Sequence, residues 1–199
     1  MKRPYAESCE QNKAVIHPVI APFLQPGMEV LEIGSGTGQH AVYFAQLNPQ
    51  IKWQTSDRAE HLPGIQSWIT FAELSNLPEP LLLDVSASWP DKKYDILFTA
   101  NSLHIMSDHQ AEDCIRNATG CLRHGGHFIV YGPFNYQGGF TSDSNRQFEA
   151  WLKHNDPDSG IKHFEVVDKI AEESGLKLRH DVAMPANNRI LIWQYETLT

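Results

Sequence analysis

The chain has 199 residues, of which 41% are hydrophobic and 20% charged, and these values are typical of a single globular domain with its own core. The formal net charge of −8 argues against a general nucleic-acid binder, no apolar run reaches the roughly 18 residues of a membrane span, and the first residues do not resemble a secretory signal. We therefore expect one soluble, cytoplasmic domain over residues 1–199, without a disulfide framework because the chain has only 3 cysteines.

Short apolar runs alternate along the chain with longer amphipathic stretches, a pattern typical of a parallel sheet flanked by helices. The predicted strands cover residues 29–33, 52–56, 80–85, 95–100, 127–131, 177–183 and 189–195. Residues 81–83 and 128–130 are apolar without alternation, which predicts strands buried between two helical layers. Only residues 184–188 separate the last two strands, too few for a crossover helix, so these two strands should pair antiparallel.

Two helices are predicted by their ends as well as by their apolar stripes. Ser107 and Gln110 have the spacing of a capping box, and apolar residues then recur at helical intervals up to Gly125. A second stripe covers residues 164–174 and ends at Gly175. Residues 133–160 are rich in Gly, Asn, Asp and Ser, with a short helix expected near residues 145–153, and their aromatic side chains indicate an ordered, lid-like insertion.

The most informative stretch joins the first predicted strand to the helix that begins near Gly38. Glycines at positions 34, 36 and 38 permit a tight turn and let a ligand approach the backbone, although a tight turn needs glycine for structural reasons as well. A dinucleotide-binding fingerprint would place its third glycine at position 39, where the chain has Gln39. Glu32 lies inside the strand just before the turn, where its carboxylate would repel a pyrophosphate and attract an ammonium or sulfonium group.

The pattern E-x-G-x-G-x-G at residues 32–38 resembles motif I of class I S-adenosylmethionine (SAM)-dependent methyltransferases. The resemblance covers roughly residues 27–195. It implies a seven-stranded, Rossmann-like α/β fold, mostly parallel with an antiparallel last strand and with helices on both faces. It also implies SAM as the cofactor. The cofactor-binding residues implied in this way are Glu32, Gly34, Gly36, Gly38, Asp57, Asp84, Val85 and Asn101.

Each cofactor residue has an implied role. Glu32 would bind the methionine ammonium, the three glycines would let the backbone approach the cofactor, and Asp57 would hold the ribose hydroxyls. Asp84 and Val85 end the third predicted strand, where the family contacts the adenine. Asp57 at the start of a helix is also a good N-cap, so a purely structural role stays open for it.

Asn101 and His104 follow the fourth predicted strand, at the usual edge of the methyl-transfer site in this family, and are the candidate catalytic residues. His104 is the candidate base for a hydroxyl or a protonated amine, because the unperturbed pKa of histidine is about 6.5. A thiolate or neutral amine acceptor would need no base, and His104 would then be a packing residue. Asn101 would provide an amide contact in the same pocket.

Polar residues of the lid and of the last turn are candidate substrate contacts: Tyr136, Arg146, Asn187 and Asn188. The two asparagines have a simpler alternative role in the hairpin turn, where Asn tolerates positive φ. No Asn/Asp-Pro-Pro-aromatic signature of base and glutamine N-methyltransferases follows the fourth strand. Together with the acidic charge, this favours a small-molecule acceptor, while protein acceptors stay open and the oligomeric state is not indicated.

A closer resemblance concerns the loops. Residues 132–134 (GPF), 139–145 (GFTSDSN), 156–157 (DP) and 184–188 (MPANN) are similar to a small subfamily that includes methyltransferase-like protein 26. Residues 1–26, with Arg3, Asn12 and Pro18, resemble the opening of that subfamily and are expected on the substrate side.

The sequence also bears on functions other than methyl transfer. The ten histidines form no recognisable ligand set, so no metal site is expected. The main alternative is a SAM-binding sensor or interaction module without catalysis. A nicotinamide-dependent oxidoreductase would require a dinucleotide that tolerates Glu32 and the misplaced third glycine.

Overall fold

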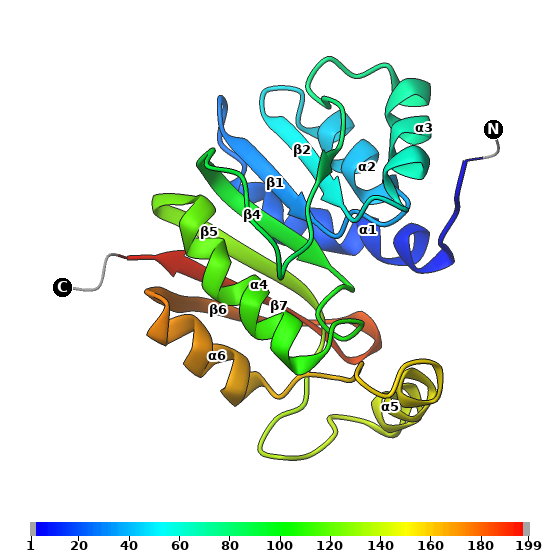
Figure 1. Ribbon diagram of the computed structural model, residues 1–199, viewed down its shortest axis with the longest axis vertical. Helices are drawn as coiled ribbons and strands as arrows, with labels where there is room; N and C mark the ends of the chain where they lie inside the picture. The colour runs from blue at the N-terminus through cyan, green and yellow to red at the C-terminus, as the bar shows by residue number, and fades with distance from the viewer. Residues whose placement is uncertain (1–2, 197–199) are drawn as a thin grey trace.

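The computed structural model describes residues 3–196 and shows a seven-stranded sheet with helices on both faces (Figure 1). The strands are β1 (Glu29–Ile33), β2 (Lys52–Asp57), β3 (Leu81–Leu82), β4 (Tyr94–Ala100), β5 (Leu122–Pro133), β6 (Leu176–Met184) and β7 (Asn188–Tyr195). Their spatial order is β3-β2-β1-β4-β5-β7-β6, and β7 runs antiparallel to both its neighbours. The predicted α/β fold is confirmed. Residues 1–2 and 197–199 of the predicted domain lie outside the described residues.

Most of the helices divide between the two faces of the sheet. They are α1 (Glu7–Ile20), α2 (Gln39–Leu47), α3 (Leu62–Ala72), α4 (Asp108–Cys121), α5 (Asp143–Asn155) and α6 (Phe164–Glu173), with short 3-10 turns at Ala21–Phe23 and Pro185–Asn187. Side chains from α1, α2 and α3 form one core with β1, β2 and β4, and α4 and α6 form the other, while α5 lies apart from both faces (Figure 1). Fully buried aromatic residues such as Trp53 and Phe128 each contribute about 2–3 kcal/mol to folding.

The capping box at the start of α4 is confirmed. Gln110 N donates to Ser107 Oγ at 3.2 Å, and Ser107 N donates to Gln110 Oε1 at 3.0 Å. The helix ends earlier than predicted, at Cys121, because β5 begins at Leu122 and contains the glycine pair expected to stop the helix. A Cβ on Gly126 would lie 2.7 Å from Asp95 O, so close contact between strands explains this glycine.

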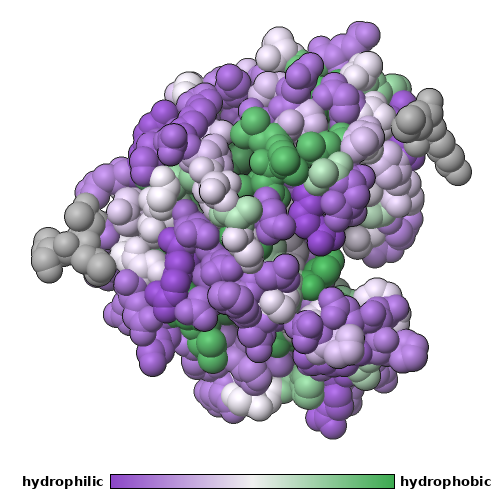
Figure 2. Space-filling model, viewed as in Figure 1, coloured by the Kyte–Doolittle hydropathy of each residue, from purple (hydrophilic) through white to green (hydrophobic). Residues whose placement is uncertain are grey.

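The third predicted strand is shorter and more exposed than its apolar run indicated. β3 contains only Leu81 and Leu82, and Leu82 is 65% exposed instead of buried on both faces. The reason is its place at the sheet edge, followed by residues 83–93, which are fully described and contain no helix to cover it. Figure 2 shows the apolar surface that results, in the part of the view occupied by β2 and β3 in Figure 1.

The helix α1 was not predicted as a helix. Its buried residues are Asn12, Ile16 and Ile20, spaced four apart, so a polar residue takes one place of its apolar stripe. Pro18 lies inside the last turns, where a proline removes one helical hydrogen bond. Over residues 3–196, no helix is both long and apolar enough to cross a membrane.

Candidate active site

The candidate site lies at the carboxyl edge of the parallel strands. The sheet order reverses between β1 and β4, and ligands of open α/β sheets bind beside such a point. The turn 34–38 follows β1, Asp57 ends β2, and Asn101 follows β4, so the topology brings these predicted residues to one edge. Figure 2 shows the surface hollowed on this side, between the part that carries α3 and the part that carries α5 in Figure 1.

The glycine turn has positive φ at all three predicted glycines, which lie at positions 34, 36 and 38. A Cβ on Gly34 would come within 2.6 Å of Ser102 Oγ, so this glycine allows the turn to pack against the segment after β4. A Cβ on Gly36 would meet no atom within 4 Å. Gly36 therefore faces open space, where a ligand can approach the backbone.

Glu32 is buried beneath this turn, with an exposure of 2%. Its Oε2 accepts hydrogen bonds from Ser35 Oγ at 3.0 Å and from Trp53 Nε1 at 3.1 Å. Among residues 3–196, its Oε1 accepts none. Burial raises the pKa of Glu32 to about 7, only partly offset by these two hydrogen bonds, and the neighbouring charge of Asp57 raises the pKa further. One carboxylate oxygen is thus left for a cation or a hydrogen-bond donor.

Asp57 is also buried, with an exposure of 8%, and it holds the turn in place. Gly36 N donates to its Oδ2 at 2.7 Å, and Arg58 N donates to its Oδ1 at 2.8 Å. The predicted alternative, a helix cap, is not its arrangement, because α3 begins only at Leu62. A carboxylate has about four acceptor positions, so two remain for hydroxyl groups of a ligand.

Asp84 and Val85 follow β3, farther along the same edge. Asp84 is exposed and accepts a hydrogen bond from Ser86 N at 3.0 Å. Val85 is buried in the core on the α4 side, and its carbonyl accepts from Trp89 Nε1 and Asn117 Nδ2. Neither residue shares a hydrogen bond with the glycine turn in the described part of the chain.

Asn101 and His104 lie directly after β4. Asn101 adopts a φ of 57°, and its N donates to Tyr131 O at 2.9 Å. His104 is 6% exposed, with its ring edge-on to Phe148 of α5 at 5.2 Å between centroids. Burial, and then the positive charge of Lys162, lowers the pKa of His104 to about 4. The imidazole is therefore neutral near pH 7 and able to accept a proton, although only as a weak base.

Within residues 3–196, none of the four candidate substrate residues forms a hydrogen bond with His104. Tyr136 stacks on Phe164 at 5.0 Å and donates from its hydroxyl to Asp181 Oδ2 at 2.9 Å, so it faces β6 and α6. Arg146 is exposed on α5, over the ring of Phe140.

Asn187 and Asn188 form hydrogen bonds within the turn between β6 and β7 and from this turn to α5. Asn187 adopts a φ of 57°, as the turn alternative predicted, and its Nδ2 donates to Ser144 Oγ at 3.2 Å. Asn188 Nδ2 donates to Pro185 O at 3.2 Å within the hairpin. Asn187 and Asn188 thus serve the hairpin turn, and the contacts of Asn187 with Ser144 and Asn145 place the hairpin beside α5.

Contacts from the N-terminal segment to the glycine turn were missed by sequence reasoning. Gln39, interpreted there only as an absent glycine, accepts from Ala6 N at 2.6 Å and donates to Glu10 Oε1 at 2.6 Å. His40 Nε2 lies 2.6 Å from Asn12 Oδ1, and burial lowers the pKa of His40 to about 4. The one sequence signal was the polar pair Gln39-His40 at the start of a helix whose next five residues are Ala, Val, Tyr, Phe and Ala.

Comparison with known proteins gives the chain its family. The sequence model of a protein family described as "Protein of unknown function (DUF938)" matches residues 3–195. The chain belongs to this family. Within residues 3–196 of this DUF938 protein, no group of three or more His, Cys, Asp or Glu side chains is placed to hold a metal ion.

Solved structures share the fold of this DUF938 protein. An O-methyltransferase family protein from Burkholderia thailandensis aligns over 96% of this chain and 59% of its own, with a TM-score of 0.80 at 14% identity. The SAM-dependent methyltransferase SibL aligns over 95% and 56%, with a TM-score of 0.79 at 20% identity. Human N-acetylserotonin methyltransferase, in complex with SAM, aligns over 96% and 53%, with a TM-score of 0.77 at 15% identity. The chain thus has the class I methyltransferase fold and spans little more than half of each neighbour.

Proposed function

We propose that this DUF938 protein binds SAM at the glycine turn and transfers its methyl group to a small-molecule acceptor near His104. The single observation that carries the proposal is Glu32, a buried carboxylate with one oxygen left without a partner in residues 3–196, beside a turn that faces open space. A carboxylate in that place suits the ammonium of a methionine moiety and repels the pyrophosphate of a dinucleotide.

The residues at the edge of the sheet fit the other parts of SAM. Asp57 keeps two acceptor positions after holding Gly36 N and Arg58 N, enough for two ribose hydroxyls. The open space beside Gly36 allows close approach to the backbone, and Asp84 and Val85 would border the adenine. The methyltransferase fold of the structural neighbours supports the same assignment.

When bound, SAM supplies a sulfonium-activated methyl group, and the chain's own residues have mainly to position it. Holding two reacting groups in line can supply roughly 7–11 kcal/mol of a barrier. Neutral His104 would accept a proton from a hydroxyl or protonated amine, and Asn101 would orient the acceptor. Residues 133–160 would cover the acceptor as a lid, because Phe148 of α5 already contacts the His104 ring. The loop resemblance to the methyltransferase-like protein 26 subfamily is consistent with this proposal.

Calorimetric titration of cofactor-stripped protein with SAM, S-adenosylhomocysteine and NADH tests the cofactor. We expect micromolar binding of both adenosyl ligands and none of NADH. Asp57→Ala should weaken SAM binding about 10- to 100-fold, the loss typical of charge-assisted hydrogen bonds. Binding of NADH alone would contradict the proposal.

A matched pair of glycine variants separates contact with SAM from backbone strain. Gly36 and Gly125 both have positive φ, and at neither would a new Cβ meet an atom within 4 Å. Alanine at either position should therefore cost about 1–2 kcal/mol of stability, because its Cβ crowds the following carbonyl oxygen in the left-handed region. Only Gly36→Ala should also abolish SAM binding, and equal SAM affinity in the two variants would place the cofactor elsewhere.

The non-catalytic alternative, a SAM-binding sensor, needs a separate test. Pools of small hydroxyl, amine and thiol compounds can be screened for release of S-adenosylhomocysteine. Turnover that is lost in His104→Ala, with SAM affinity retained, supports catalysis with His104 as base. SAM binding without turnover on any pool would favour the sensor.

A further inference from the structure

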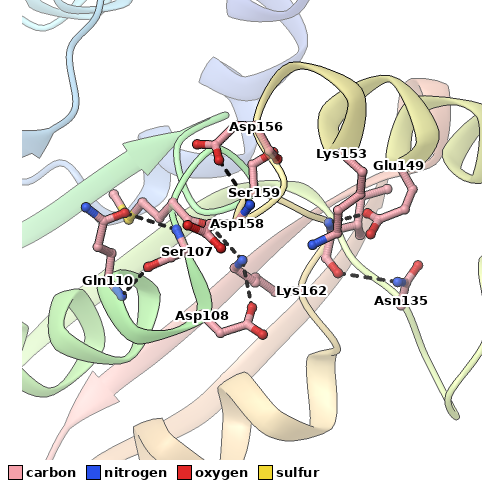
Figure 3. Close-up of polar contacts among 12 residues, drawn as sticks. Ser107, Asp108, Gln110, Asn135, Glu149, Lys153, Asp156, Asp158, Ser159 and Lys162 are labelled. Atoms are coloured by element: carbon pink, nitrogen blue, oxygen red, sulfur yellow. Dashed lines mark hydrogen bonds and ion pairs between the residues drawn. The ribbon is translucent and has the colours of Figure 1, made fainter.

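A buried lysine joins the segment after α5 to the segment after β4. Lys162 lies between α5 and α6, and its side chain is only 7% exposed. Its Nζ donates to Met106 O at 2.8 Å and pairs with Asp108 Oδ1 at 2.9 Å (Figure 3). Both partners belong to the stretch that leads from His104 into α4, so one ammonium group holds this stretch at two points.

The same segment holds His104 through the backbone. Gly160 N donates to His104 O at 2.9 Å. The segment is anchored in turn, because Ile161 N donates to Glu149 Oε2 at 2.6 Å and Asn135 N donates to Lys162 O at 2.9 Å. Figure 3 shows Asn135 and Glu149 on one side of Lys162, and Asp108 at the start of α4 on the other. The place of His104 therefore depends on elements outside β4.

Lys162 lines a cavity of about 260 Å³ whose walls are both apolar and charged. Ala111, Ile115 and Val167 line it together with Glu112, Glu149 and Lys153, and in residues 3–196 none of these charged side chains contacts Nζ of Lys162. Burying an ammonium costs desolvation, and an ion pair to Asp108, which is 95% exposed, contributes little stability in return. An unbranched apolar side chain would occupy the same space without that cost. What the charged group adds is a fixed geometry, because only a donor can hold the Met106 carbonyl and the Asp108 carboxylate in place.

We propose that Lys162 is a positioning residue, which fixes residues 104–108 so that His104 and the start of α4 keep their place beside the acceptor. The proposal rests on the proposed function only for the role of His104. Lys162 forms no hydrogen bond with the glycine turn within residues 3–196, so its loss should leave SAM affinity unchanged. Its charge also lowers the pKa of His104, second to burial, which provides a spectroscopic readout.

The test compares Lys162→Met, Lys162→Arg and Asp108→Asn in the full chain. The measurements are the NMR titration of the His104 ring, hydrogen exchange of the amides of residues 104–108, and calorimetric SAM affinity. Lys162→Met should raise the His104 midpoint while keeping it below the ordinary value, because burial remains. It should also speed amide exchange about tenfold, the effect of losing one charge-assisted hydrogen bond. Lys162→Arg, which keeps the charge and donors, should stay close to the wild type.

Asp108→Asn is the matched control. It removes the exposed partner of the ion pair but keeps the lysine charge and its bond to Met106 O. The His104 midpoint should not rise in this variant. The proposal would be overturned if folded Lys162→Met left both the His104 titration midpoint and the amide exchange of residues 104–108 unchanged. It would also be overturned if the His104 midpoint rose equally in Asp108→Asn. Should Lys162→Met fail to fold, Lys162→Gln gives the same neutral comparison.

Failure of the proposed function would be distinguishable from failure of the positioning role of Lys162. If the wild type does not bind SAM but the His104 midpoint and exchange change as described, the positioning role of Lys162 stands without methyl transfer.

Discussion

The buried carboxylate of Glu32 leads to a prediction about stability against pH. Because burial raises its pKa from 4.5 to about 7, the folded state keeps a proton that the unfolded state has already lost between these values. The folded protein therefore loses stability as the pH rises through this range. Glu32→Gln keeps an oxygen for the hydrogen bonds from Ser35 Oγ and Trp53 Nε1 but does not titrate.

The size of the effect follows from the pKa. Each pH unit between the two values contributes about 1.4 kcal/mol, so near pH 8 the variant should be more stable than the wild type by about 3 kcal/mol. Near pH 4 the two proteins should be equally stable, because both side chains are then neutral. Urea unfolding at several pH values measures the difference. Parallel stability curves for the two proteins across this range would refute the reasoning.

The same substitution should weaken SAM binding under the proposed function. An ammonium beside Glu32 lowers the pKa of the carboxyl, so binding should release a proton near pH 6. Calorimetry in buffers of different ionisation enthalpy detects that proton. Proton release should disappear in Glu32→Gln, and its persistence there would assign the proton to another group.

Three further predictions concern a pair of glycines, Asn12 and His104. Gly126→Ala should destabilise the protein by about 1–3 kcal/mol in urea unfolding, because the new Cβ would press on two backbone carbonyl oxygens. Gly120 lies on α4, where a Cβ would meet no atom within 4 Å, so Gly120→Ala should stabilise the protein by about 0.5–1 kcal/mol. Asn12→Ala should lower the stability by about 1–3 kcal/mol, since it leaves the buried His40 ring without its partner. The His104 ring should titrate in NMR only near pH 4.

Each of these has an outcome that contradicts it. Equal unfolding midpoints for the two glycine variants would mean that the strand contact at Gly126 relaxes freely. An unchanged melting temperature for Asn12→Ala would show that the N-terminal helix is not held through His40. A His104 midpoint near its ordinary value would mean that the ring is open to water.

Much of the fold is predictable because it depends on local patterns. The alternation of apolar runs and amphipathic stretches gave the strand order in the chain, and the five-residue connection gave the antiparallel last strand. The capping box of Ser107 and Gln110 was predictable because the two residues lie three positions apart at the start of a helix. The exposure of Leu82 was not predictable in this way, since it depends on which strand lies at the edge and on the helix absent from residues 83–93.

The candidate site likewise has some features that local sequence sets and others that depend on packing. By itself the sequence determined the glycine turn, the acidic residue before it and the carboxylates at the strand ends, because these are set by positions a few residues apart. Only the tertiary structure decided that Gln39 holds Ala6 across 33 positions, and that Lys162 holds Met106 across 56. Such contacts depend on how whole elements pack, and hydrogen bonds form only within a few tenths of an ångström. Periodicity carries no information about those distances, which is why the residues that hold the site in place emerged only from the fold.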